Sequence, residues 1–377
     1  IYKMINWWLD KGIAGFRIDA IINIKKDLEW RSLPSDRENG LVPVPESLVN
    51  AQPIEPFLQE LKERTFAKYN AFTVGEVFNE TDEELHFFIG KDGVFSSIFD
   101  FKQTMLGQEG KGWFDHALPT ADELKESIFQ AHERADCIGV LSTIIENHDE
   151  PRGVSHYIAE GPVNDTSKKA LGTIQILRKG IPFIYQGQEI GMENQVFESV
   201  EDFDDIATIN GYHVAKEAGL TEEEALAAIA KYSRDNARTP MQWSAEPGLG
   251  FSDGPAWLIS PKPNVAINVK DQEKDPNSIL NYYRQLTALY RHPLYGNTIR
   301  FGDMIPAYRD RENIIAFERR GDKRLLVVSN FQNRQATLEL PAPIKTVVLN
   351  NTAGLFQEGD QVLELVPYQT VVLELEE

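Results

Sequence analysis

Five short apolar segments, separated by helical patterns, constrain the fold of this chain more than any other feature. The predicted strands are residues 15–20, 71–77, 95–101, 138–145 and 181–187. Between them, apolar residues recur at helical spacing, as in 53–68, 81–89, 121–134 and 166–178. This alternation predicts a parallel sheet with crossover helices. No G-x-G-x-x-G loop follows a strand, which favours a (β/α)₈ barrel over a doubly wound dinucleotide-binding sheet.

Carboxylates stand at or near the C-terminal ends of three of these strands, namely Asp19, Glu76 and Asp149. Barrels carry their active sites at that end, so the three side chains should converge in one cleft. Three carboxylates in one site repel, and at least one should hold a proton near neutral pH. Arg17 lies two positions before Asp19, points to the same side of the strand and favours its ionised form. Glu76, at the end of an apolar strand, is then the expected acid.

One ionised and one protonated carboxylate are what the cleavage of a glycosidic bond requires. A divalent-metal site is the competing interpretation, because hard cations also bind carboxylates, yet Arg17 is out of place beside a metal ion. His148, next to Asp149, can donate a hydrogen bond to a ligand hydroxyl. The neighbouring Glu146 and Glu150 add negative charge and are expected to raise the pKa of the acid.

Charge and cysteine content limit the partners of the chain. With 58 acidic and 38 basic residues the net charge is −20, which argues against nucleic acid and anionic membranes but not against a neutral ligand. The single cysteine, Cys137, excludes an intramolecular disulfide and fits a reducing, cytoplasmic compartment. No segment is apolar enough over a sufficient length to span a bilayer.

Residues 1–296 are predicted to form the barrel domain, with an irregular excursion at 21–52 that we interpret as a loop over the site. An insertion at about 192–256 holds an acidic run, 198–205, that we expect to be a solvated face. Residues 297–377 predict a small antiparallel β-sandwich domain. The strands expected in this domain are 314–318, 324–330, 335–340, 346–350, 361–365 and 370–375. Before it, helices are expected at 221–232 in the insertion and at 278–290 at the end of the barrel.

Four motifs resemble those of the α-amylase superfamily of retaining glycoside hydrolases, family 13: Gly15-Phe16-Arg17-Ile18-Asp19, Val74-Gly75-Glu76, Asn147-His148-Asp149 and the string 233–243. Within the family, the chain is most similar to the oligo-1,6-glucosidase, dextran glucosidase and α-glucosidase group. The resemblance implies the C-terminal part of a (β/α)₈ TIM barrel, strands four to eight, followed by the β-sandwich.

The resemblance also implies roles for individual residues. Asp19 would be the nucleophile, Glu76 the general acid and then base, and Asp149 would stabilise the oxocarbenium-like transition state. Further implied roles are that Arg17 holds Asp19, that His148 donates to a hydroxyl of the −1 glucose, and that Arg238 pins the non-reducing end. Arg234 is an alternative to Arg238, and a structural ion pair inside the insertion is the alternative for both. Trp243 is expected in the core.

Ala20, directly after the nucleophile position, bears on linkage. Relatives that prefer α-1,6 bonds tend to carry Val there, and those that act on α-1,4 bonds tend to carry a smaller or polar residue. A smaller side chain leaves room for the +1 sugar, so Ala20 favours α-1,4 bonds with α-1,6 activity still open. A difference of one methylene in a pocket is worth only about 1–3 kcal/mol.

The implied activity is that of an exo-acting α-glucosidase on short malto- and isomalto-oligosaccharides. The resemblance begins before barrel strand four, so we expect a fragment that lacks the N-terminal third, is poorly soluble and inactive alone, and is a monomer when full length. No metal or cofactor site is visible; a family calcium site would lie in the missing part. The alternatives are a non-catalytic homologue of the transporter-subunit type, a trehalose-6-phosphate hydrolase, and a sucrose isomerase or other transglucosidase.

Overall fold

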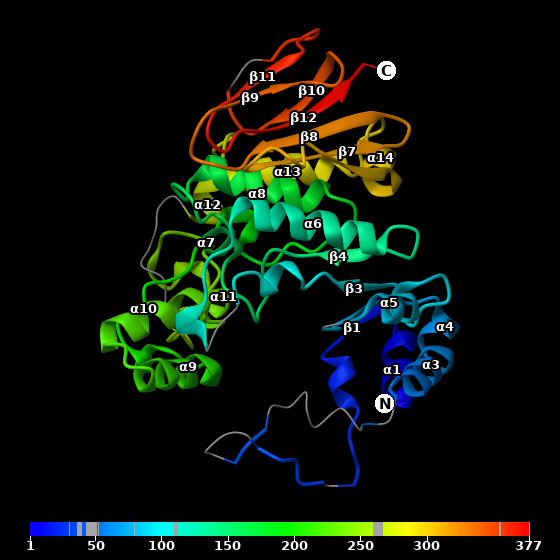
Figure 1. Ribbon diagram of the computed structural model, residues 1–377, viewed down its shortest axis with the longest axis vertical. Coiled ribbons are helices and arrows are strands. Elements are labelled where there is room, and N and C mark those ends of the chain that lie inside the picture. The colour runs from blue at the N-terminus through cyan, green and yellow to red at the C-terminus, as the bar shows by residue number, and fades with distance from the viewer. Residues whose placement is uncertain are drawn as a thin grey trace. The chain divides into compact units, whose positions relative to one another are not determined.

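A computed structural model describes residues 1–29, 31–35, 40–42, 51, 53–78, 80–108, 112–258, 267–353 and 356–376 (Figure 1). Contacts divide the chain into two compact units. The first consists of residues 1–100 and 133–142, and the second of residues 101–132 and 143–377. Each unit is described by itself below.

The five predicted strands are present, each shorter than predicted. Hydrogen bonding orders them as they follow one another along the chain, and the first three pairings are parallel. A sheet in chain order with helices between its strands is the barrel arrangement, whereas a doubly wound sheet reverses its order at a switch point. The strands are β1 (Gly15–Ile18), β2 (Phe72–Gly75), β3 (Ser97–Phe99), β4 (Leu141–Thr143) and β5 (Ile181–Pro182).

The core of the first unit is formed by one apolar face of each helix against the strands. In α1, Ile5 and Leu9 are buried whereas Met4, Trp7 and Trp8 are exposed, so only part of its apolar pattern faces this core. A capping box in which Thr81 and Glu84 satisfy each other's backbone N–H groups begins α5. Helical elements of this unit are α1 (Tyr2–Asp10), η1 (Ile21–Ile24), α3 (Glu55–Arg64), α4 (Phe66–Tyr69) and α5 (Asp82–Ile89).

Much of the loop predicted over residues 21–52 lies outside the described residues, including 36–39 and 43–50. Its described part begins with the 3₁₀ helix η1. The interpretation of this segment as a loop over the site therefore stays a prediction.

In the second unit, the C-terminal strands form two antiparallel sheets. The larger has the order β10-β12-β8-β7-β6 and the smaller pairs β11 with β9. Side chains alternate between two cores: Phe317 and Val327 pack with the helices, while Ala316 and Val328 pack with the smaller sheet. The strands are β6 (Asp303–Ala307), β7 (Ile314–Arg320), β8 (Arg324–Asn330), β9 (Ala336–Glu339), β10 (Ile344–Asn350), β11 (Val362–Leu365) and β12 (Thr370–Leu375).

Strand β6 is not among the strands predicted from the sequence, and it contains Pro306, a residue that argues against a central strand. The strand lies at the edge of its sheet, where proline is tolerated. Helices α8 and α13 pack beneath this sheet (Figure 1). Helical elements that are not in the insertion are η2 (Gln103–Met105), η3 (Trp113–Asp115), α6 (Ala121–Ala135), which crosses the boundary between the units, α7 (Gly153–Tyr157), α8 (Asp165–Leu177), η4 (Gln188–Ile190), α12 (Val269–Gln272), α13 (Ile279–Leu289) and α14 (Gly296–Phe301).

The predicted insertion folds as a helical subdomain that corrects two expectations. The acidic run is not wholly solvated, because Asp205 is 4% exposed, caps α9 through the N–H of Thr208 and pairs with an arginine. Trp243 is not in the core: it is 50% exposed, and Met241 takes the buried position on this segment instead. Its elements are η5 (Val200–Asp202), α9 (Ile206–Glu217), α10 (Glu222–Tyr232), α11 (Asp235–Arg238) and η6 (Pro247–Gly250).

No helix among the described residues combines the length and the apolar character needed to cross a membrane.

Candidate active site

The first half of the candidate site follows strands β1 and β2 in the first unit. Parallel register sets Ile18 opposite Gly75, and the N–H of Glu76 donates to the carbonyl of Ile18 at 2.9 Å, so the residues after both strands are neighbours. Arg17 donates from Nη1 to Asp19 and from Nη2 to Oε2 of Glu76, the latter at 2.8 Å. The guanidinium therefore bridges both carboxylates, where the sequence indicated a contact with Asp19 alone.

Ala20 supplies a second donor to Glu76. Its backbone lies in the left-handed region, with φ 38° and ψ 38°, which is unusual for a residue other than glycine. In this conformation its N–H donates to Oε2 of Glu76 at 2.7 Å. The turn that follows the nucleophile position thus holds the carboxyl group expected to act as the acid.

The two carboxylates differ sharply in exposure. The side chain of Asp19 is 75% exposed, and that of Glu76 is 7% exposed. Burial raises the pKa of Glu76; the Ala20 N–H and Arg17 oppose this rise, and the nearby charge of Asp19 adds to it. A buried carboxyl with a raised pKa suits a proton donor, and an exposed one paired with arginine suits an anion.

The second half of the candidate site surrounds Asp149, between β4 and α7 in the second unit. Nε2 of His148 lies 3.0 Å from Oδ2 of Asp149. Arg238, the last residue of α11, donates from Nη2 to Oδ1 of Asp149 at 2.8 Å and from Nε to the carbonyl of His148 at 2.9 Å. Arg234 donates to the same Oδ1 from Nη1 at 3.4 Å. Both arginines that the sequence left as alternatives therefore reach Asp149.

Two aspartates of the insertion, Asp205 and Asp235, pair with these arginines. Sequence reasoning did not find them as part of the site. Asp205 accepts from Nε of Arg234 at 3.1 Å. Asp235, fully buried, lies 3.7 Å from Nη1 of Arg238 and accepts the N–H of Asp205 at 2.9 Å. Burial acts to raise the pKa of Asp205, but the hydrogen bonds from Arg234 and Thr208 outweigh it and lower the pKa.

Glu146 and Glu150, which flank the Asp149 motif, behave differently from each other. Glu146 is 1% exposed and accepts from Nη1 of Arg152 at 2.9 Å and from the N–H of Gly153 at 2.6 Å. The negative charge expected of Glu146 is therefore paired with Arg152. Burial raises the pKa of Glu150 to about 7, with the charge of Asp149 adding to the rise.

Arg152 joins three segments of the second unit. Besides Glu146, its Nη1 donates to the carbonyl of Gln186 at 2.8 Å, and its Nη2 to that of Ala237 at 3.5 Å. Its side chain is 1% exposed. The segments that carry Asp149 and Arg238 are thus tied together by a buried guanidinium.

Asp19, Glu76, Arg17 and Ala20 lie in the first unit, whereas Asp149, His148 and Arg238 lie in the second. The convergence of the three carboxylates in one cleft therefore stays a prediction.

Within the described ranges, no group of three or more His, Cys, Asp or Glu side chains is arranged to hold a metal ion.

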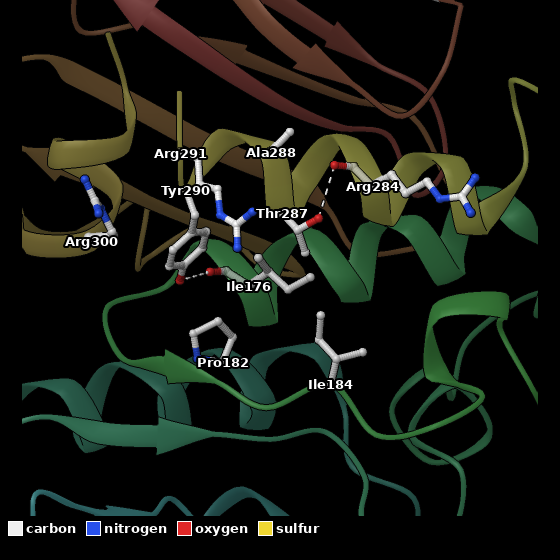
Figure 2. Close-up of a pocket in the computed structure, with 9 residues that line it drawn as sticks. All are labelled: Ile176, Pro182, Ile184, Arg284, Thr287, Ala288, Tyr290, Arg291 and Arg300. Carbon is white, nitrogen blue, oxygen red and sulfur yellow. Dashed lines mark hydrogen bonds between the residues drawn. The ribbon is translucent and has the colours of Figure 1, made fainter. Parts of the chain in front are cut away.

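Figure 2 shows a cavity of about 670 Å³ in the second unit that none of the predicted site residues lines. The guanidinium groups of Arg284, Arg291 and Arg300 lie apart along it rather than converging. Arg284 is paired with Glu273 at 2.9 Å. The cavity therefore lacks the convergent polar groups of a catalytic site.

Comparison with known families shows the family of the chain. Residues 1–294 match the family model of the alpha amylase catalytic domain, and residues 314–372 match that of the alpha-amylase SusG C-terminal domain. The first match covers more than half of the chain. The chain belongs to the α-amylase family.

This α-amylase family chain is 39% identical over 293 residues to "Probable oligo-1,6-glucosidase 3" of Bacillus subtilis (strain 168), which covers 77% of the chain and 52% of that protein. It is 33% identical over 382 residues to the oligo-1,6-glucosidase of Bacillus cereus, covering 100% of the chain and 68% of that protein. The chain thus spans about half to two thirds of the length of the curated relatives it matches.

Solved structures of family members share the fold. The isomaltulose synthase from Klebsiella sp. LX3 superposes with a TM-score of 0.90 at 28% identity, covering 100% of the chain and 67% of that structure. The trehalose-6-phosphate hydrolase of Bacillus licheniformis superposes with a TM-score of 0.87 at 30% identity, covering 100% and 68%. The barrel-type fold with a C-terminal antiparallel sheet domain is therefore that of the α-amylase family.

Proposed function

We propose that the protein containing this chain is a retaining, exo-acting α-glucosidase that hydrolyses terminal α-glucosidic bonds of short malto- and isomalto-oligosaccharides. The observation that carries the proposal is the Arg17-bridged pair after β1 and β2, in which Asp19 is exposed and Glu76 is buried with a raised pKa. Its neighbours in sequence, named as oligo-1,6-glucosidases, support the same class of reaction.

Double displacement assigns a separate task to each carboxyl group. Asp19 attacks the anomeric carbon while Glu76 protonates the glycosidic oxygen, which gives a β-glucosyl ester on Asp19 and releases the first product. Glu76, now ionised, removes a proton from water, which attacks the anomeric carbon and releases α-glucose and free Asp19. Arg17 keeps Asp19 anionic before it attacks and again after the ester is hydrolysed.

The second half-site binds the ring that reacts. In this proposal Asp149 accepts hydrogen bonds from the sugar hydroxyls as the ring distorts, and His148 donates to one of them. Arg238 orients Asp149 and pins the non-reducing end, with Arg234 supporting the same carboxylate. These contacts act together only if the two half-sites face one substrate.

For the linkage, we propose that α-1,4 bonds are favoured and that α-1,6 bonds are also cleaved. The small side chain of Ala20 beside Asp19 leaves room for the +1 sugar of an α-1,4 substrate. The names of the relatives point toward α-1,6 bonds instead, so the two linkages are separate arms of the test. The same proposal includes a monomer that acts in the cytoplasm on small oligosaccharides, with no nucleic acid or membrane as partner.

The test is to express the complete reading frame that contains this chain and to measure glucose release from maltose and isomaltose. Asp19→Ala and Glu76→Gln should abolish release, whereas Glu63→Gln, on the exposed face of α3, should leave it unchanged. The first anomer formed, followed by ¹H NMR, should be α. A folded protein that releases glucose from neither sugar would contradict the proposal and favour a non-catalytic homologue. Activity confined to trehalose 6-phosphate, or isomaltulose formed from sucrose, would favour the other two alternatives.

A further inference from the structure

We propose that a cavity beside Arg238 in the second unit is an accessory site for a neutral saccharide, with Trp257 and Phe251 as its sugar-binding faces. The ligand class rests on the proposed function, because the cavity would be a second place where gluco-oligosaccharides bind. Its geometry is independent of the half-site in the first unit.

The cavity measures about 520 Å³ and is built by the segment that follows α11, together with Gln186 after β5. Sites for small ligands usually measure about 300–1,000 Å³, so this cavity can take a disaccharide unit. Among the described residues that line it, Arg238 is the one that carries a charge. The same guanidinium binds Asp149 at 2.8 Å, so a ligand in the cavity would lie against a residue of the reaction pocket.

Two aromatic side chains that line this cavity are largely exposed. Trp257 is 67% exposed and Phe251 is 59% exposed. Isolated exposed apolar residues are common on protein surfaces, but two aromatic rings lining one concave site mark a binding surface. One face of a pyranose ring consists of C–H groups, and such a face packs on aromatic rings while the hydroxyls stay solvated.

A hydrogen bond orients Trp257. Its indole N–H donates to Oδ2 of Asp204 at 2.9 Å, and the N–H of Asp204 donates to the buried Asp235 at 2.8 Å. A ring that is held in place loses less conformational freedom when a ligand packs on it. The acidic segment of the insertion therefore has a second task besides holding Arg234.

The charge of the cavity favours a neutral sugar over a sugar phosphate. The charge of Arg238 is already compensated by Asp149 and, at 3.7 Å, by Asp235. A phosphate group would need an uncompensated cation, and none is found among the described lining residues of the cavity. A neutral gluco-oligosaccharide also meets no repulsion from a chain of net charge −20.

Trp243 offers a matched control on the same segment. It is 50% exposed but does not line the cavity. With 5-fluorotryptophan labelling each tryptophan gives its own ¹⁹F resonance, and six of these come from this chain. The signals of Trp257 and Trp243 can be assigned with Trp257→Phe and Trp243→Phe.

The experiment is a titration of the labelled complete protein, carrying Asp19→Ala, with maltotriose. The Trp257 resonance should shift saturably and the Trp243 resonance should not. Phe251→Ala should weaken the affinity read from the Trp257 shift by about 3- to 10-fold, as the loss of one aromatic contact predicts. A Trp257 signal that does not move, that moves together with Trp243, or that responds only to trehalose 6-phosphate would overturn the proposal.

The outcome is separable from that of the proposed hydrolysis. A saturable Trp257 shift in a protein that hydrolyses no sugar would support the accessory site and contradict the proposed hydrolysis. Hydrolysis with no response at Trp257 would support the proposed enzyme and exclude the accessory site. If Phe251→Ala does not fold, Trp257→Ala takes its place, with the loss of maltotriose binding measured by calorimetry.

Discussion

Arg17 donates to Oε2 of Glu76 at 2.8 Å while its other terminal nitrogen binds Asp19. One guanidinium therefore acts on the ionisation of both carboxyl groups of the proposed reaction. Its planar fork suits this bridge, which the single ammonium of a lysine cannot reproduce.

Arg17→Gln should reduce kcat/KM by about 100-fold, the cost expected when reacting groups lose their positioning. Because Arg17 lowers the pKa of Glu76, its removal should also let the acid stay protonated to higher pH. The basic limb of the kcat/KM profile should then move upward. Arg17→Lys keeps the charge, so it should lose rate with much less movement of that limb. Equal pH profiles for both variants and the wild type would contradict this account.

The strands could be predicted because they depend on local patterns. Apolar runs indicate where barrel strands lie, and β1 to β5 fall within the predicted ranges, although each ends before the predicted last residue. The contact of Arg17 with Glu76 could not be predicted, because it depends on the register of β1 against β2. No spacing rule links residues 59 positions apart.

The supporting residues were harder still to predict. Asp205 lies in an acidic run that looks solvated, and its partner Arg234 is 29 positions away. One signal was available: Asp205 precedes a helical pattern, where aspartate is a common N-cap. Trp243 was misplaced because composition says that a tryptophan is usually buried, while the tertiary fold gave the core position to Met241.

Asp205→Asn should destabilise the protein by about 1.5–3 kcal/mol at neutral pH, the range for a hydrogen bond to a charged group. Asparagine can still cap α9, so the loss reports the contact with Arg234. The pKa of Asp205 is lowered in the fold, so its contribution is complete above about pH 4, the unfolded value, and disappears as the pH falls further. The free energies of unfolding of Asp205→Asn and the wild type, measured by denaturation, should therefore become more similar below that pH. Glu201→Gln, an exposed change in the same run, should have almost no effect.

The buried pair of Glu146 and Arg152 should show strong coupling in a double-mutant cycle. Arg152→Met leaves the Glu146 carboxyl buried without its cation, which should cost about 3–5 kcal/mol. Glu146→Gln together with Arg152→Met should recover much of that loss, because neither charge then remains. Arg309→Met breaks a pair with Glu126 whose partners are 42% and 40% exposed, and should cost less than about 1 kcal/mol. Additive single effects at Glu146 and Arg152 would exclude the coupling.

His156 should make the protein sensitive to mild acid. The side chain is 5% exposed, and neither ring nitrogen has a hydrogen-bond partner among the described residues. It packs against Tyr157 and Tyr232, with ring centroids 4.7 and 6.1 Å away. Burial lowers its pKa to about 4, with nearby His116 adding to the effect.

The sign of this effect follows from the two states. An unfolded histidine has a pKa of about 6.5, so the unfolded chain binds the proton first as the pH falls. Stability should therefore decrease from about pH 6.5 to about pH 4, by up to about 3 kcal/mol, and then level off. His156→Phe keeps the aromatic packing and removes the titration. Its midpoint of denaturation should match or exceed that of the wild type near pH 7.5 and exceed it clearly at pH 5. The exposed change His213→Gln should produce no such divergence, and parallel behaviour of His156→Phe and wild type across this range would rule out the assignment.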